Sequence, residues 1–342
     1  MSGELGMSVE LKEAPEAVRR QARSLLQPLG ELIVWCRRAP PRLVVTCARG
    51  SSAHAATFGK HLVERHLGIP VTAAAPNIAT VYRQRLQLKG QLVLAISQSG
   101  RSDDLIEFVL MAKAAGARTA AIVNDTDSPL AAACDFPLPM AAGPQVSIAA
   151  TKSFVTSLVV LLRLIAAWTN DDVLLEAIDR LPDRLAAASE LDWSSALSAL
   201  SAANSLVTIG RGPTLAIARE AALKLKETCN LHAEAFSGPE FQHGPISLVS
   251  PLYPIMLFMP TDAAAMGLRD LAADLRRKGA ALFTTDQDGP EVGRLPALGL
   301  DHPDADAVCL IQSFYALALR IAEQRGSDVD RPRHLQKVTR TR

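Results

Sequence analysis

Residues 91–104 of the sequence read QLVLAISQSGRSDD, an apolar run followed by a short polar stretch and two aspartates. Near-continuous apolar runs such as residues 91–96 are typical of parallel strands that are covered on both faces. The polar stretch contains Gly100 and ends at Ser102, a residue type that favours the position just before a helix. The segment therefore predicts a buried strand, a glycine turn and a helix over residues 103–115.

The same alternation of apolar runs and helical patterns extends over the whole chain. It predicts a doubly wound α/β fold, in which helices cover both faces of a parallel sheet. The other predicted strands are residues 42–47, 118–123, 205–209, 254–259 and 280–284. The other predicted helices are residues 52–66, 151–168, 214–228 and 264–278, with a further helical run that ends near residue 203.

The pattern also repeats within the chain. Arg49-Gly50 matches Arg211-Gly212 and Gly116 matches Gly279, at offsets of 162 and 163 residues. A constant offset through strand, turn, helix and strand predicts a duplicated domain, each copy with three α/β/α layers. We expect a helical segment over residues 1–34, domains over 35–172 and 190–325, and a tail over 326–342.

Length and charge limit the classes of protein to which the chain can belong. Its 342 residues suffice for about two domains. Lys and Arg number 36 against 35 Asp and Glu, a net charge of +1, which gives no broad positive field for nucleic acid or anionic lipid. The longest apolar stretch, residues 154–168, includes Arg163 and is shorter than the ~20 residues of a membrane span. We therefore expect no nucleic-acid partner and no membrane span.

Two further features predict a cytoplasmic protein. The first 20 residues carry charges throughout and contain no apolar signal-peptide core. The five cysteines are scattered and form no Cys-X-X-Cys pair, which favours reduced thiols and provides no zinc framework.

The turn after the predicted strand 91–96 is a candidate phosphate site. Hydroxyls, free backbone N–H groups and the positive end of a helix dipole would meet there, and a glycine allows close approach of the backbone to a ligand. A second serine turn follows the strand 42–47, so both turns would lie at the carboxyl edge of one sheet. The candidate residues are Ser51, Ser52, Ser97, Gln98, Ser99 and Ser102. The alternative is two helix caps without a ligand. No nucleotide fingerprint is present, and we expect no cofactor.

In the second half, Glu220, Lys224 and Glu227 fall on one face of a predicted helix. A solvated ion-pair stripe is the alternative, but the neighbouring residues are small or apolar, as in a buried helix. A carboxylate flanked by a lysine and a second carboxylate is suited to act as a general base. His243 could move protons near neutral pH. His232 and His243 could instead bind a metal, but a third ligand at suitable spacing is missing, so no metal is expected.

Five blocks carry a resemblance to a known family. They are SQSGRSDD (97–104), AATKSF (149–154), EAALKLKE (220–227), HAEAFSGPEFQHGP (232–245) and GSDVDRPRHLQK (326–337). Together they resemble the double sugar isomerase (SIS) domain family. More closely, they are similar to the isomerase half of glucosamine-6-phosphate synthase and to the stand-alone type II glucosamine-6-phosphate deaminases. The resemblance implies two flavodoxin-like SIS domains and a homodimer with shared active sites.

The resemblance also implies roles for particular residues. The six residues of the serine turns would hold the phosphate of a sugar 6-phosphate. Glu227 would move the proton between C1 and C2, supported by Glu220 and Lys224. His243 would open the sugar ring, donated from the opposite subunit. Lys337 would form an imine with the ketose carbonyl.

The chain also departs from the synthase pattern. Residue 2 is Ser2 where the synthase has a cysteine nucleophile, and only about 35 residues precede the first predicted strand. We therefore expect no glutaminase domain and no supply of ammonia from glutamine within this chain. Arg49 replaces a cysteine, and the segment 76–82 lacks the usual glutamate.

These departures favour a deaminase that converts glucosamine 6-phosphate to fructose 6-phosphate and ammonia. A fructosyl-amine-6-phosphate deglycase or another phosphosugar isomerase is the alternative enzyme. From a different class, the chain could be a sugar-phosphate-binding regulator without catalysis. The retention of Glu227, His243 and Lys337 and the absence of a DNA-binding extension disfavour the regulator.

Overall fold

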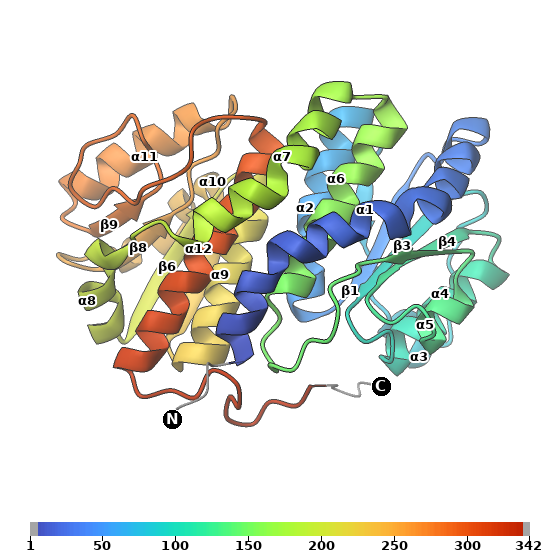
Figure 1. Cartoon of the computed structure of the whole chain (residues 1–342), viewed down its shortest axis with the longest axis horizontal. Helices are drawn as coiled ribbons and strands as arrows, with labels where there is room; N and C mark the ends of the chain where they lie inside the picture. The colour runs from blue at the N-terminus through green and yellow to red at the C-terminus, as the bar shows by residue number, and fades with distance from the viewer. Residues whose placement is uncertain (1–5, 338–342) are drawn as a thin grey trace. The chain divides into compact units, whose positions relative to one another are not determined.

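In the computed structural model, which describes residues 6–337, helices and strands form two units that are each built on one parallel sheet (Figure 1). The N-terminal unit contains Glu16–Gln145 and Lys152–Asp179, together with residues 336–337. The C-terminal unit contains residues 6–15, Val146–Thr151 and Arg180–Leu335. The long first helix, α1 (Gly6–Arg38), contributes residues to both units.

The sheet of the N-terminal unit has the strand order β2-β1-β3-β4-β5, with all pairs parallel. Its strands are β1 (Val44–Ala48), β2 (Val71–Ala73), β3 (Leu92–Ser97), β4 (Arg118–Val123) and β5 (Phe136–Pro139). The central strand β3 is buried along its whole length, as the apolar run predicted. Chain order reverses between β1 and β3, which is where open α/β sheets bind ligands.

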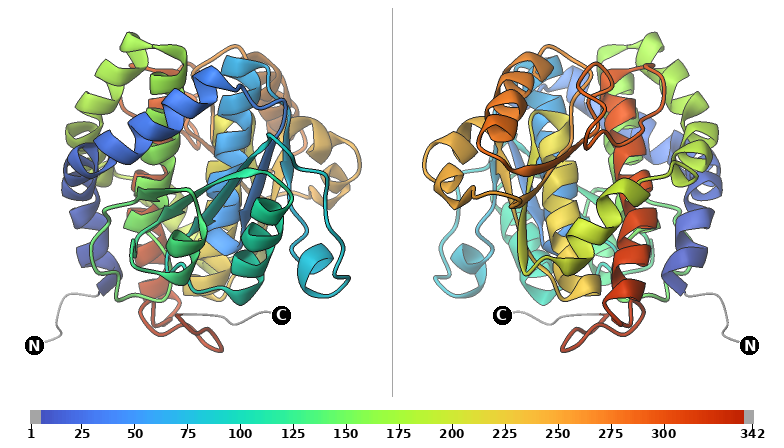
Figure 2. Two further views of the ribbon diagram at one scale, coloured as in Figure 1. Left: turned by 90° about the vertical axis from the view of Figure 1, so that its right-hand side faces the viewer. Right: turned by 90° about the vertical axis from the view of Figure 1, so that its left-hand side faces the viewer.

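Helices cover both faces of this sheet (Figure 2, left). On one face, α3 (Asn77–Thr80), α4 (Asp103–Ala114) and α5 (Pro129–Ala133) share a core with strand residues such as Val93 and Ala95. The other face carries α2 (Gly50–Leu67) and α6 (Lys152–Thr169). The two helices pack closely at Gly59, where a Cβ would lie only 2.9 Å from a Leu161 methyl group.

The sheet of the C-terminal unit has the order β7-β6-β8-β9, also all parallel. Its strands are β6 (Ser205–Gly210), β7 (His232–Ser237), β8 (Pro254–Leu257) and β9 (Ala281–Thr284). Beyond β9, where the first sheet has β5, Thr284 instead forms a parallel bridge with Arg294. The Thr284 N–H donates to Gly293 O at 2.8 Å, so an irregular segment covers this edge.

This sheet too is covered on both faces (Figure 2, right). On one face α10 (Gly238–Gln242) and α11 (Ala265–Arg277) share a core with Ile209 and Leu257. The other face carries α9 (Pro213–Cys229) and α12 (Pro303–Gln324), which lie side by side (Figure 1). The remaining helices are α7 (Asp172–Ser189), α8 (Ser194–Ala202) and the short 3-10 helix η1 (Pro245–Leu248).

The predicted fold class, two doubly wound parallel sheets from a duplication, is confirmed. Strands β2-β1-β3-β4 and β7-β6-β8-β9 follow the same order. The matched glycines Gly116 and Gly279 have the same left-handed backbone, with φ of 85° and 81°, one turn after equivalent helices. The division into segments 1–34, 35–172, 190–325 and 326–342 remains a prediction.

Some elements differ from the sequence prediction. Strands β2, β5 and β7 were not predicted. The helical run up to residue 203 is two helices, α7 and α8, separated at residues 190–193. Trp193 is buried there and its indole N–H donates to Pro296 O at 2.8 Å, a tertiary contact that the helical pattern does not encode.

Helices α6 and α12 are long and apolar enough to span a membrane by length and composition, but 78% of an apolar 18-residue stretch in each is buried within the structure. Both therefore have the character of core helices, as predicted for the stretch 154–168. The five cysteines are also buried and unbridged. Burial raises the pKa of Cys36, Cys47, Cys134 and Cys309 to about 12 and that of Cys229 to about 11, so these thiols stay protonated at neutral pH.

Candidate active site

The serine-rich turn of the N-terminal unit joins β3 to α4. The Ser97 hydroxyl at the end of β3 accepts a hydrogen bond from the Gly100 N–H at 3.1 Å, which closes the turn. Ser99 Oγ accepts from the Arg101 N–H at 3.3 Å. Ser102 occupies the predicted N-cap position of α4, although its side chain does not accept a hydrogen bond from the first turn of the helix. The turn is therefore shaped by its own hydroxyls and backbone.

Gly100 is required by the shape of this turn. Its φ of 63° is left-handed, and a Cβ at this position would lie 2.0 Å from the hydroxyl oxygen of Ser128. Ser128 is the N-cap of α5 and accepts from the Ala131 N–H at 3.4 Å. The turn thus packs directly against the start of α5, with no room for a side chain.

The second serine turn lies at the same edge of the sheet. Ala48 at the end of β1 pairs with Ile96 next to the end of β3, so both turns leave adjacent strands together. Ser51 and Ser52 form the first turn of α2, and Arg49 is its N-cap. The Arg49 guanidinium bonds to Asp104 Oδ2 at 2.8 Å and remains half exposed. The structure therefore brings all six predicted phosphate-site residues to one edge, beside a cation.

The charged stripe of the C-terminal unit is an internal network. Lys224 on α9 is completely buried, and its Nζ lies 3.3 Å from Glu220 Oε1, which is also completely buried. The ammonium group also bonds to Glu227, whose side chain is 21% exposed. Burial disfavours the charged lysine, but the two carboxylates outweigh it and raise the pKa of Lys224 above its ordinary value. The lysine therefore stays charged between two carboxylates, and one of these faces solvent.

Tyr315 of α12 extends this network. Its hydroxyl donates to Glu220 Oε1 at 3.4 Å, and the ring is fully buried. Burial and the neighbouring Glu220 raise the pKa of Tyr315 well above its ordinary value, so it remains a neutral donor. Sequence analysis missed this residue, because its position on another helix follows from no spacing in the chain.

The remaining predicted residues lie on other elements than α9. His243 is exposed at the C-cap of α10. At the N-cap of the same helix, the Ser237 hydroxyl donates to Glu240 Oε2 at 2.8 Å. His232 is exposed on β7. Lys337 is exposed and falls in the N-terminal unit. The geometry brings together Glu220, Lys224 and Glu227, and separately the two serine turns.

Comparison with known families identifies the fold. The family model described as the SIS domain matches residues 39–167 and 199–321. The chain belongs to the SIS domain family. The two matched segments correspond to the two copies of the duplication.

Several curated relatives of this SIS chain are glutamine–fructose-6-phosphate aminotransferases. It is 33% identical over 316 residues to glutamine–fructose-6-phosphate aminotransferase of Symbiobacterium thermophilum, covering 86% of this chain and 51% of the relative. It thus spans about half the length of the curated relatives that it matches.

Solved structures give the same picture for the fold. A proposed phosphosugar isomerase of Silicibacter pomeroyi is 42% identical, with a TM-score of 0.92, and covers 96% of this SIS chain and 100% of its own. The C-terminal domain of glucosamine-fructose-6-phosphate aminotransferase of Francisella tularensis has a TM-score of 0.85 at 24% identity, covering 97% and 99% of the two chains. The latter likeness concerns the fold alone.

Proposed function

We propose that this SIS chain is a phosphosugar isomerase that acts as an aminosugar-phosphate deaminase. Glucosamine 6-phosphate and water would give fructose 6-phosphate and ammonia. The observation that carries the proposal is the buried Glu220–Lys224–Glu227 network, which holds one partly exposed carboxylate beside a charged lysine. Such a carboxylate is fixed in position and can accept and return a proton.

The proposed reaction needs only proton transfers and one hydrolysis. His243 opens the pyranose ring, and the Glu227 carboxylate removes the proton from C2 to give an enolamine. The same group returns the proton to C1, which leaves an imine at C2. Water adds to this imine and releases ammonia, so that the C2 ketone of fructose 6-phosphate remains. Lys337 either stabilises the C2 imine, or its amine adds to C2 and displaces ammonia; water then hydrolyses the resulting lysine imine to the same ketone and frees the lysine.

The serine turns of the N-terminal unit are the proposed phosphate site. Hydroxyls and helix N-termini at the ends of β1 and β3 suit a dianion, and the half-exposed Arg49 guanidinium, paired with Asp104, has further N–H donors at the same edge. We further propose a cytoplasmic homodimer in which His243 serves the site of the opposite subunit.

Ammonia release from a panel of aminosugar 6-phosphates and fructosyl-amine 6-phosphates tests the proposal. Ammonia from glucosamine 6-phosphate, with equimolar fructose 6-phosphate, is the expected result. Release of free amine from fructosyl-amine 6-phosphates alone would instead identify a deglycase. Binding without any product would identify a regulator.

Matched variants test the residue assignment. Glu227→Gln should abolish exchange of the C2 proton with solvent deuterium and leave sugar-phosphate binding intact. Glu234→Gln is the control, because Glu234 is an exposed carboxylate on β7 in the same unit. Exchange at the wild-type rate in Glu227→Gln would show that another group is the base.

A further inference from the structure

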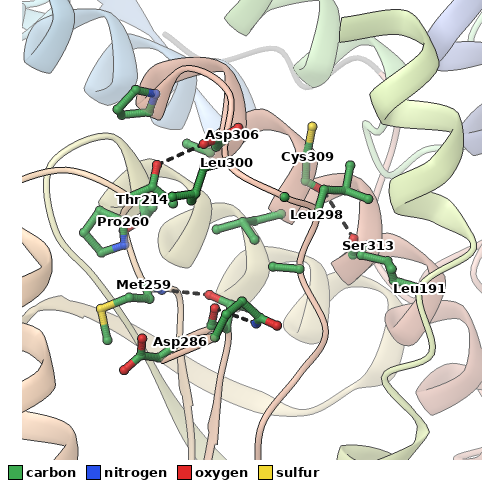
Figure 3. Close-up of a pocket in the computed structure, with 18 of the residues that line it drawn as sticks. Leu191, Thr214, Met259, Pro260, Asp286, Leu298, Leu300, Asp306, Cys309 and Ser313 are labelled. Carbon is green, nitrogen blue, oxygen red and sulfur yellow. Dashed lines mark hydrogen bonds between the residues drawn. The ribbon is translucent and has the colours of Figure 1, made fainter. Parts of the chain in front are cut away.

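The C-terminal unit contains a cavity of about 200 Å³ at the carboxyl edge of its sheet (Figure 3). Met259 and Pro260 after β8 line it, as do Thr285 and Asp286 after β9. Leu298 projects into the centre of the view from the segment that precedes α12. The volume exceeds the ~150 Å³ of an apolar cavity that holds benzene.

This cavity lies at the topological counterpart of the serine turns. Chain order in the second sheet reverses between β6 and β8. Thr214, from the helix after β6, and Met259, after β8, both line the cavity, and Thr214 Oγ1 donates to Phe258 O at 2.8 Å. Ligands of open α/β sheets bind at this reversal point. The second copy therefore has a cavity at the position where the first copy has its serine turns.

The lining differs in chemistry from a phosphate site. Apolar atoms form most of its wall, and Leu191, Met259, Leu298 and Leu310 contribute to it. A mostly apolar wall with a few placed polar groups is the usual composition of a small-molecule site. The sequence after β8 reads Met259-Pro260-Thr261, without the serines and glycine of the first copy. The wall therefore favours a ligand with an apolar body.

The charges of the lining disfavour anions. Two arginines and three aspartates line the cavity, a formal sum of −1. Arg184 bonds to Asp306 at 2.7 Å, and Arg269 bonds to Asp286 at 3.2 Å, so both cations are already paired. The Asp306 carboxylate also accepts from Thr261 at 3.0 Å and from the Asp301 N–H at 3.3 Å.

Asp288 is 78% exposed to solvent, so of the two buried lining aspartates Asp286 has the carboxylate oxygen with capacity for a ligand. The Asp286 side chain is only 6% exposed. Its Oδ1 accepts from Arg269 Nε at 3.2 Å and from the Asp288 N–H at 3.3 Å, and it pairs with Arg269 Nη2 at 3.2 Å, whereas Oδ2 shares the Arg269 Nε–H at 3.3 Å. A carboxylate oxygen can accept a further, shorter bond from a charged donor. In Figure 3, Asp306 lies near the top and Asp286 near the bottom of the group of side chains drawn as sticks.

We propose that this cavity binds a small organic amine, with the ammonium group on Asp286 and an apolar ring against Met259, Leu298 and Leu310. The site uses none of the residues assigned to the sugar phosphate. It is therefore independent of the proposed reaction, and its ligand is of opposite charge to the sugar phosphate.

Three probes of similar size and different charge test the proposal on the full chain. Isothermal titration at pH 7 would compare 2-phenylethylamine, 2-phenylethanol and phenylacetate. The amine should bind most tightly, with phenylacetate weaker by at least about tenfold because it meets a net negative lining. Equal affinities for amine and phenylacetate, or no binding of the amine, would overturn the proposal.

Variants locate the binding. Asp286→Asn should lower the affinity for the amine by about tenfold, whereas Asp274→Asn, on α11 but outside the cavity, should not. Leu298→Trp fills the cavity and should block all three probes, so the test stands even if Asp286→Asn does not fold. Fructose 6-phosphate binding should survive Leu298→Trp. Unchanged amine binding in Leu298→Trp would contradict the assignment, whatever the outcome for the sugar phosphate.

Discussion

Lys224 Nζ lies 3.3 Å from Glu220 Oε1, and both side chains are completely buried in the C-terminal unit. Removing one partner of such a pair leaves an uncompensated charge in the interior. Because Lys224 also binds Glu227, the residue that fixes the position of Glu227 is the one on which the stability of α9 depends.

Lys224→Met should lower the free energy of unfolding by about 3–5 kcal/mol, because Glu220 is left buried without its cation. Urea unfolding followed by circular dichroism measures this. The double variant Glu220→Gln/Lys224→Met should recover part of the loss. Lys226→Met, at an exposed position on the same helix, should change stability by less than about 0.5 kcal/mol. Equal losses in the two lysine variants would contradict the burial argument.

Gly100→Ala should destabilise the N-terminal unit more than Gly90→Ala does. Both glycines have positive φ, 63° and 74°, so each substitution carries the left-handed cost of roughly 1–2 kcal/mol. Only the Gly100 Cβ meets another group, Ser128, whereas nothing lies within 4 Å at Gly90. The clash adds a further ~1–3 kcal/mol. Thermal unfolding compares the two, and Ser128→Gly should partly rescue Gly100→Ala.

Ser99→Ala should raise KM for the sugar 6-phosphate with little change in kcat. The lost hydrogen bond to a charged phosphate is worth roughly 1.5–3 kcal/mol. Steady-state kinetics and titration with the phosphorylated and dephosphorylated sugar measure the effect, with Ser247→Ala on η1 as control. Unchanged affinity for the phosphate, and equal binding of the dephospho-sugar, would remove the serine turn from the site.

The free energy of unfolding should fall as the pH rises above 9. The buried Cys36 thiol has its pKa raised by burial from 9.0 to about 12, so the folded protein keeps a proton that the unfolded chain releases. Stability from this thiol is complete below pH 9 and is lost on approaching pH 12. Urea unfolding between pH 8 and 11 should show a shallower decline for Cys36→Ala than for the wild type. Parallel declines would show that this thiol does not contribute.

Mixing inactive His243→Ala and Glu227→Gln subunits should restore activity if each site uses both subunits of a homodimer. After complete random exchange, half the dimers are mixed and each holds one intact site, so about one quarter of the wild-type activity should return. Native mass spectrometry would verify the exchange. An inactive mixture after verified exchange, or a monomer in sedimentation, would exclude a shared site.

The sequence predicted central strands better than edge strands. Strands such as β3 are buried on both faces and read as apolar runs. The missed strands β2, β5 and β7 lie at sheet edges, where half-exposed residues interrupt that pattern. β5 contains Pro137 and Pro139, which are unfavourable within a sheet and tolerated at its edge. In β7 the exposed His232 and Glu234 interrupt the apolar run.

Some contacts of the candidate site could also be predicted from the sequence, and others could not. The spacing of Glu220, Lys224 and Glu227 placed them on one helix face, because a helix has a fixed period, and the two salt bridges of Lys224 confirm that placement. Contacts between segments that are separated along the chain follow no fixed residue spacing. Tyr315 beside Glu220 and Ser128 beside Gly100 therefore emerge only from the folded chain.

The segment that covers the edge of β9 has a consequence for the behaviour of the chain at high concentration. A bare parallel edge offers its N–H and C=O groups to a strand from another molecule. Gly293 accepts from Thr284 only because it has no side chain, since a Cβ there would lie 1.9 Å from Leu282 O. A larger residue at Gly293 would uncover the edge, and the four-stranded sheet would then become a template for aggregation by strand addition.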